Sequence, residues 1–219
     1  MTEAATTTVT LPSVIPVFPL TGVILLPGSN LPLNIFEPRY LQMIRDAVTS
    51  DGLIGMVQPR VPESEDPHPD LYPVGGVGKI DDLVETGTNR FAIRLRGLAR
   101  FEVREELSTT TPYRQVHAGW DRFRDSPMNP DVSLVDRRQL LATLSGYLEH
   151  RGLDADFDAI SEAPDDVLVN TLAMIIPFGA PEKQALLEAE TVGNRAEILG
   201  TLLKMALIEA DPTNTSNLH

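Results

Sequence analysis

Prolines interrupt one of the most apolar stretches of this chain, residues 15–40. A buried helix could not contain them, and a central strand would lose a ladder hydrogen bond at each one. We therefore predict a small, strongly curved barrel whose prolines lie at strand ends, edges and bulges. The five prolines are Pro16, Pro19, Pro27, Pro32 and Pro38. The first three strands are predicted at residues 14–18, 22–26 and 31–36.

The composition is that of a globular protein without cysteine chemistry. The chain has 219 residues and 42% hydrophobic side chains, enough for one large domain or two small ones with a real core. It has no cysteine, which excludes disulfides, a thiolate zinc site and a cysteine nucleophile. The first ten residues do not resemble a signal peptide, and no apolar run reaches the ~18–20 residues of a membrane-spanning helix. A cytoplasmic protein is expected.

The net charge of −13 argues against nucleic acid and anionic membrane surfaces as partners, because both repel an acidic protein. Residues 121–219 carry 17 acidic and 8 basic side chains, against 14 and 10 in residues 1–120. A local basic strip does occur on one predicted strand. We interpret it as a solvated strand face balanced by nearby acids, with binding of RNA or an acidic peptide as the alternative. The strip contains Arg90, Arg94, Arg96 and Arg100.

The pattern of apolar residues changes near residue 120, from short β-branched runs to helical spacing. Before this point we predict one helix at 38–48, with Pro38 in its first turn and Leu41, Ile44 and Val48 on one face. The remaining β elements are predicted at 53–58, 74–85, 90–97, 100–103 and 113–120, with a mobile loop at 59–73 and a hairpin turn at 87–89.

Helix signals dominate the second half. One helix is predicted to end before Gly152, and its apolar stripe is Leu134, Leu141, Leu144 and Leu148. Further helices are predicted to start at Pro164 and at Pro181, where a proline precedes acidic residues. The last is predicted to start at Asn194, with Glu197 at the spacing of a capping box.

Motifs for cofactor or metal chemistry fail in detail. The sequence VGGVGK (74–79) lacks the first glycine and the final Ser or Thr of a phosphate loop, so we interpret its glycines as permitting a close backbone approach. The sequence DADFD (154–158) lacks the later Gly and Glu of a calcium loop and is interpreted as an acidic loop between helices. No GxSxG or HExxH occurs. We expect no cofactor, no metal and no catalytic residue.

Several segments together resemble the N-terminal substrate-binding domain of the Lon protease family. The resemblance covers roughly residues 14–210, and FEPRY (36–40) is more similar to stand-alone members than to the full protease. In the first half it rests on Phe18-Pro19-Leu20, Val23, Leu25, Pro27-Gly28, Pro32-Leu33, the stretch 71–80, and Gly97 with Arg100. In the second half it rests on Lys183-Gln184, Leu186-Leu187-Glu188 and Arg195.

The resemblance implies an α+β fold, a PUA-like β pseudobarrel followed by an α-helical bundle subdomain. Full-length members continue into an ATPase domain and a Ser-Lys protease domain. This chain shows no Walker motif and no candidate dyad, so a stand-alone domain without either activity is expected. The implied boundaries are a flexible N-terminus at 1–13, the barrel at 14–122, the helical subdomain at 123–210 and a disordered tail at 211–219.

The function that the resemblance implies is non-enzymatic. We expect a module that binds unfolded or exposed apolar segments of proteins or regulates proteolysis, with a protease as partner; self-association stays open. The alternatives are an RNA-binding PUA-like module and an enzyme with a small-molecule pocket. For each candidate residue the competing interpretation is structural, with the aromatics in the core and the arginines in ion pairs. The candidates are Phe36, Arg39, Tyr40, Phe91 and Arg100.

Overall fold

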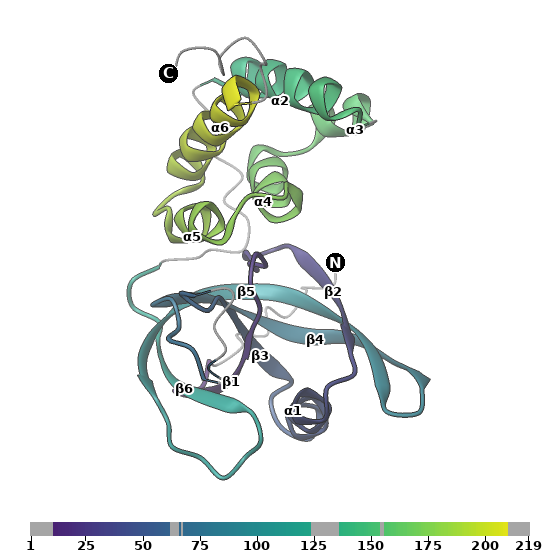
Figure 1. Cartoon of the computed structure of the whole chain (residues 1–219), viewed down its shortest axis with the longest axis vertical. Coiled ribbons are helices and arrows are strands. Elements are labelled where there is room, and N and C mark those ends of the chain that lie inside the picture. The colour runs from purple at the N-terminus through teal and green to yellow at the C-terminus, as the bar shows by residue number, and fades with distance from the viewer. Residues whose placement is uncertain (1–10, 62–65, 67, 124–135, 154–155, 210–219) are drawn as a thin grey trace, which may run out of the picture.

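The computed structural model of the chain consists of a β-barrel and a group of helices stacked on one end of it (Figure 1). The predicted tail (211–219), most of the predicted flexible start (1–13), Leu134 and the centre of the predicted loop (59–73) lie outside the described residues. So do residues 124–135, next to the predicted domain boundary. The structure describes residues 11–61, 66, 68–123, 136–153 and 156–209.

Within the described residues, six strands form one sheet that closes on itself. The order is β2-β5-β4-β3-β1-β6, and β6 pairs in turn with the end of β5. β1 and β3 are parallel, and the other neighbours are antiparallel. The predicted α+β fold, a barrel followed by helices, is confirmed. The strands are β1 (Val14–Pro19), β2 (Asn30–Ile35), β3 (Leu53–Val57), β4 (Val74–Gly87), β5 (Arg90–Glu106) and β6 (Arg114–Gly119).

Strand β5 closes the barrel because it has partners along its whole length. Its first residues pair with β2, its last residues pair with β6, and β4 runs beside most of it. The sequence predicts two separate strands here, but the structure has one. A register shift opposite Val77 and Gly78 accommodates Leu98 as an extra residue, which bends the strand without ending it.

Helix α1 (Pro38–Val48) lies at the barrel end away from the other helices (Figure 1). It starts as predicted, with Pro38 in the first turn, where a missing amide donor costs little. Leu41 and Ile44 are buried, as their spacing predicts. Val48 was predicted on the same face but is 53% exposed, because it occupies the last position of the helix at the barrel surface.

The helical half departs from the predictions at two starts. α3 begins within the predicted acidic loop, of which residues 154–155 lie outside the described part. α6 begins before Asn194, because the hydroxyl of Thr191 accepts a hydrogen bond from the Asn194 amide at 3.1 Å and caps the helix. The helices are α2 (Arg137–Arg151), α3 (Phe157–Glu162), α4 (Asp165–Ile175), α5 (Ala180–Glu188) and α6 (Val192–Glu209).

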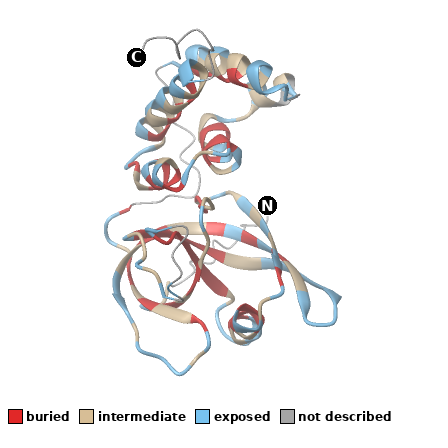
Figure 2. Ribbon diagram, viewed as in Figure 1, coloured by how far each residue is buried: buried red, intermediate tan, exposed pale blue. Residues whose placement is uncertain are grey.

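The apolar segment 22–26 was predicted as a strand, but the structure assigns none to it. The segment passes between the two halves of the molecule. Ile24 and Leu26 pack in the helical core, whereas Leu25 packs in the barrel core. Its alternating side chains therefore join two cores, which gives a strand-like pattern without a ladder. Figure 2 shows the buried residues along the strands and on the inner sides of the helices.

Glycines in β4 and β5 make room for this segment. A Cβ atom at Gly76 would lie 1.8 Å from the Leu25 carbonyl oxygen, and one at Gly97 would lie 2.1 Å from that of Leu26. The interpretation of VGGVGK as a site of close backbone approach is thus confirmed at Gly76. Among the described residues, no helix is both long and apolar enough to cross a membrane.

Candidate functional site

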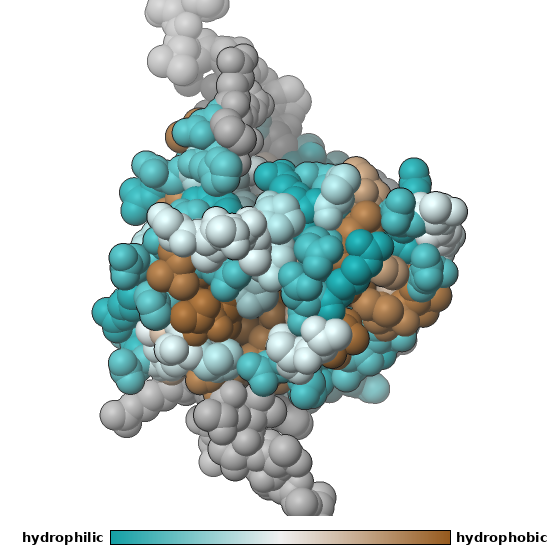
Figure 3. Space-filling view, turned by 90° about the horizontal axis from the view of Figure 1, so that it is seen from below, coloured by the Kyte–Doolittle hydropathy of each residue, from teal (hydrophilic) through white to brown (hydrophobic). Residues whose placement is uncertain are grey.

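Large apolar side chains are exposed on the barrel around α1 and the β4–β5 hairpin. Phe36 is 62% exposed and Val84 is 52% exposed. Figure 3 views the barrel end away from the helices and shows apolar areas with hydrophilic side chains between them. Exposed apolar surface rimmed by polar residues commonly marks an interaction site. We call this surface the apolar rim and define it as Phe36, Val48, Ile80, Leu83, Val84 and Phe91.

Strand register explains how the rim is presented. Ile35 at the end of β2 pairs with Phe91 at the start of β5, so their side chains share the face that packs towards α1. Phe36 follows Ile35 and therefore points to the opposite, outer face, as the alternation of a strand requires. Val84 pairs with Ala92 on that outer face. The rim thus wraps around the hairpin, with aromatic side chains on both of its faces.

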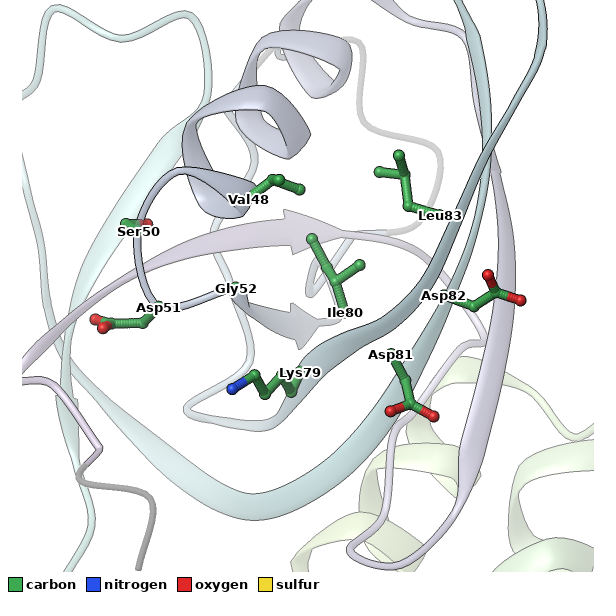
Figure 4. A pocket seen from close by; sticks show the side chains of 9 residues that line it. All are labelled: Val48, Ser50, Asp51, Gly52, Lys79, Ile80, Asp81, Asp82 and Leu83. Atoms are coloured by element: carbon green, nitrogen blue, oxygen red, sulfur yellow. The ribbon is translucent and has the colours of Figure 1, made fainter. Parts of the chain in front are cut away.

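A shallow open depression adjoins the rim between the end of α1 and β4. Its volume is about 330 Å³. Figure 4 shows Val48, Ile80 and Leu83 on one side of it, with Lys79, Asp51 and Asp81 around them. An apolar floor with a polar border can accept an apolar side chain of a partner whose backbone stays at the border.

Two arginines lie over aromatic rings beside the rim. The guanidinium of Arg45 lies 5.6 Å from the centre of the Phe91 ring, and that of Arg39 lies 4.6 Å from the Tyr40 ring. Arg39 also pairs with Glu37 at 2.9 Å. Of the predicted site residues, Phe36, Arg39 and Phe91 therefore reach this part of the surface together.

Tyr40 lies beneath the surface and supports it. It is 5% exposed and its ring packs against Phe18, with the ring centres 4.1 Å apart. Burial raises the pKa of the Tyr40 hydroxyl. A second tyrosine also supports α1. The Tyr113 hydroxyl donates a hydrogen bond to Asp46 at 2.8 Å, and burial together with this carboxylate raises the pKa of Tyr113 to about 12.

Arg100 lies apart from the rim, between the barrel and the helices. It is 3% exposed and donates hydrogen bonds to the carbonyl oxygens of Leu187, Ala189 and Glu190, where α5 ends. Its guanidinium also lies 3.9 Å from the centre of the Phe123 ring. The negative end of the α5 dipole favours a cation at this place. In this structure Arg100 joins the two halves of the molecule.

Two glutamines complete this joint, which we define as Gln58, Arg100 and Gln184. The Gln58 amide nitrogen donates to the Ala180 carbonyl at 3.0 Å and to the Gln184 side-chain oxygen at 3.1 Å. Gln184 in turn donates to the Val74 carbonyl at 3.1 Å. Among the described residues, no buried side-chain nitrogen or oxygen lacks a partner. The joint is therefore a fully satisfied polar contact, which fixes how the two halves meet.

The structure explains why Lys183, Gln184 and Arg195 belong to the family resemblance, because all three are buried and make hydrogen bonds. Lys183 donates to the last carbonyls of α4, those of Ala173 and Met174, and its burial lowers the pKa of its ammonium group to about 8. Arg195 donates to the Leu186 carbonyl at 2.8 Å and to the Asn170 side chain at 2.8 Å. These two polar residues connect α4, α5 and α6 within the helical half. The sequence analysis did not predict the joint. The only sequence signal at this place was the adjacent pair Lys183-Gln184 in the family resemblance.

Two of the four arginines of the basic strip on β5, Arg94 and Arg96, are exposed and balanced by acids, as the structural interpretation predicts. Arg100 does not lie on a solvated face, because it is buried in the joint. Arg94 lies 3.5 Å from Asp81 and Arg96 lies 3.7 Å from the same carboxylate. Asp82 adds a third contact at 4.0 Å from Arg94. Because the charges of Arg94 and Arg96 are matched within the sheet, these two residues give no support to the RNA-binding alternative. In the described part of the chain, no three His, Asp or Glu side chains form a cluster suited to a metal ion.

The fold defines an α+β module of two parts, a closed barrel and a helical domain. The polar joint connects the two parts, and the apolar rim is exposed on the barrel. Residues 14–205 match the family described as the ATP-dependent protease La (LON) substrate-binding domain. The chain belongs to this family. The match is to the region named for substrate binding and not to a catalytic domain.

Relatives and solved structures agree. Lon protease 2 of Myxococcus xanthus is 30% identical over 196 residues, which cover 88% of this chain and 24% of that protein. The chain thus spans about a quarter of the length of this relative. A Lon N-terminal domain protein from Xanthomonas campestris has a TM-score of 0.62 at 22% identity, covering 88% of this chain and 98% of that one. The N-terminal domain of a Mycobacterium avium complex Lon protease gives 0.62 at 20% identity, covering 87% and 98%.

Proposed function

We propose that this chain is a polypeptide-binding module that recognises exposed apolar segments of unfolded proteins through the apolar rim. Membership of a family named for substrate binding supports this function. The observation that carries it is the exposure of Phe36, Val48, Leu83 and Val84 around one helix and one hairpin. The proposed partner is a Lon-type protease, to which bound segments would be delivered, and the proposed location is the cytoplasm.

The physical basis is the burial of apolar surface on both partners. Fully burying a side chain such as Phe36 contributes roughly 1.5–3 kcal/mol. β2 pairs with β5 on one side, and within the described residues no strand covers its other side. Pro32 lies in the middle of β2 and cannot donate a backbone hydrogen bond, so it weakens this edge for strand addition. Side-chain contacts with the rim, rather than an added strand, therefore form the proposed recognition.

Binding is tested by fluorescence anisotropy with a labelled, permanently unfolded protein and its folded form as control. We expect saturable binding to the unfolded form only. The double variant Phe36→Ser and Leu83→Ser should bind at least about tenfold more weakly, because a loss of about 1.4 kcal/mol is tenfold in affinity.

A matched control exists on the helical domain. Ile175 is 66% exposed, similar to Phe36, but lies on α4. Ile175→Ser should bind like the unaltered protein. Equal binding by the rim variant and the unaltered protein would show that recognition uses another surface. No binding at tens of micromolar would refute the recognition of unfolded chains in general.

A further inference from the structure

Two exposed arginines at the rim differ from the other arginines around them. Arg45 on α1 and Arg90 at the start of β5 form no ion pair with any residue that the structure describes. Arg39, Arg94 and Arg96 each have a carboxylate partner. The positive charges of Arg45 and Arg90 are thus unmatched in a chain whose net charge is −13.

The two arginines flank Phe91 of the apolar rim, Arg45 through its ring contact and Arg90 as the preceding residue of the chain. Arg45 lies over the Phe91 ring and donates to the side-chain oxygen of Asn89 at 3.5 Å. Asn89 directly precedes Arg90 in the hairpin turn, where its φ is 57°. The contact with Asn89 is with a neutral amide, so it orients Arg45 without neutralising it. A polypeptide that covers Phe91 therefore meets Arg45 at the edge of its apolar contact. Strand alternation directs Arg90 to the outer face of the hairpin, the face of Phe36 and Val84, so a segment that wraps around the rim meets the second cation there.

We propose that the apolar rim prefers extended segments in which carboxylates flank the apolar side chains. This inference rests on the proposed function and names its substrate class. A guanidinium binds a carboxylate through two parallel hydrogen bonds, and the contact strengthens when apolar neighbours exclude water. The rest of the chain is acidic and repels a carboxylate-rich partner, so the preference is confined to segments short enough to stay at the rim.

The test uses labelled peptides that share the same alternating Phe and Val residues and differ in the flanking positions, which are Asp, Asn or Lys. Exposed ion pairs contribute modestly, so the Asp peptide should bind about three- to tenfold more tightly than the Asn peptide. The Lys peptide should bind least. The advantage of Asp should disappear near molar salt, where charges are screened within a few ångströms.

Variants assign the effect to the two arginines. In the double variant Arg45→Gln and Arg90→Gln, the Asp and Asn peptides should bind with equal affinity. Arg138 on α2 is also exposed, and Arg138→Gln should keep the full preference. Both arginines are exposed, so the variants should fold, which a thermal unfolding curve checks.

The outcomes separate this inference from the proposed function. If the Asp and Asn peptides bind the unaltered protein equally, the preference for carboxylates is wrong and the polypeptide-binding function stands. If no peptide binds, the proposed function itself fails. If a short single-stranded RNA binds through Arg45 and Arg90 more tightly than the Asp peptide, the two cations serve phosphate instead and the inference is overturned.

Discussion

The joint and the apolar rim depart from the usual distribution of side chains in opposite ways. The joint buries Gln58, Arg100 and Gln184, whose polar atoms all find partners across two domains. The rim exposes large apolar side chains such as Phe36 and Val84. A buried polar group that is satisfied fixes one arrangement of the chain, whereas an exposed apolar group is stabilised by covering it. The joint therefore serves the fold, and the rim is the better place to look for a partner.

Gly76→Ala should have the largest effect on stability, because Gly76 contacts the segment 22–26 that passes between the two halves beside the joint. The added Cβ would overlap the Leu25 carbonyl oxygen at 1.8 Å, and backbone on both sides would have to move. We expect a loss of unfolding free energy above about 3 kcal/mol. Urea unfolding followed by the fluorescence of Trp120, the one tryptophan of the chain, measures it.

A glycine with open space around it provides the control. Gly200 lies in α6, and a Cβ there would meet no atom within 4 Å. Gly200→Ala should leave stability unchanged or raise it by about 0.5–1 kcal/mol, because alanine favours a helix. If both variants unfold at the same urea concentration as the unaltered chain, the segment 22–26 does not hold the two cores together as described.

Arg100→Met should have the next largest effect. Methionine keeps much of the side-chain volume but removes the donor to the carbonyls of Leu187, Ala189 and Glu190. Ala189 keeps only a longer contact from Arg195 at 3.5 Å. An unsatisfied buried acceptor costs about 1–3 kcal/mol, so we expect a loss of about 2–3 kcal/mol. Arg94→Met, on the exposed strip of the same strand, should change stability by less than about 0.5 kcal/mol. Equal losses in the two variants would contradict the different roles assigned to them.

Local patterns in the sequence predict the elements of the fold but not the joint. The first and third strands of the proline-rich start, the α1 pattern and the start of α4 each depend on neighbours a few residues away, and these appear in the structure. The segment 22–26 shows why prediction stops there. Its consecutive buried side chains point alternately into two different cores, which only the tertiary fold brings together.

The candidate site shows the same limit. Arg94 and Arg100 look alike in sequence, six residues apart on one basic run. The bulge at Leu98 and the approach of α5 place one in solvent and the other between domains. Phe36 and Tyr40 are both aromatic residues of FEPRY, yet one is exposed and the other is buried. The periodicity of a helix or strand predicts which residues share a face. Which of these faces meets a second domain depends on contacts that are distant in sequence.

Tyr113→Phe should give the smallest effect at neutral pH and a distinct one in alkali. The hydroxyl of Tyr113 donates to Asp46 and holds α1 beneath the rim, so its loss should cost about 1 kcal/mol near pH 7. The folded pKa of about 12 lies above the unfolded value of 10.0, so the folded state binds more protons between these values. This contribution to stability is complete below pH 10 and is lost as the pH rises towards 12.

The difference in unfolding free energy between the unaltered chain and Tyr113→Phe reports on this tyrosine alone, because all other titrating groups are common to both. Urea unfolding of the unaltered chain at a series of alkaline pH values should show a decline of about 1–3 kcal/mol attributable to Tyr113, and Tyr113→Phe should lack that part. The gap between the two stability curves should therefore close, and then reverse, as the hydroxyl ionises beside Asp46. A gap that stays constant with pH would mean that Tyr113 titrates normally and does not secure α1. The support of the rim would then come from the packing of Tyr40 against Phe18 alone.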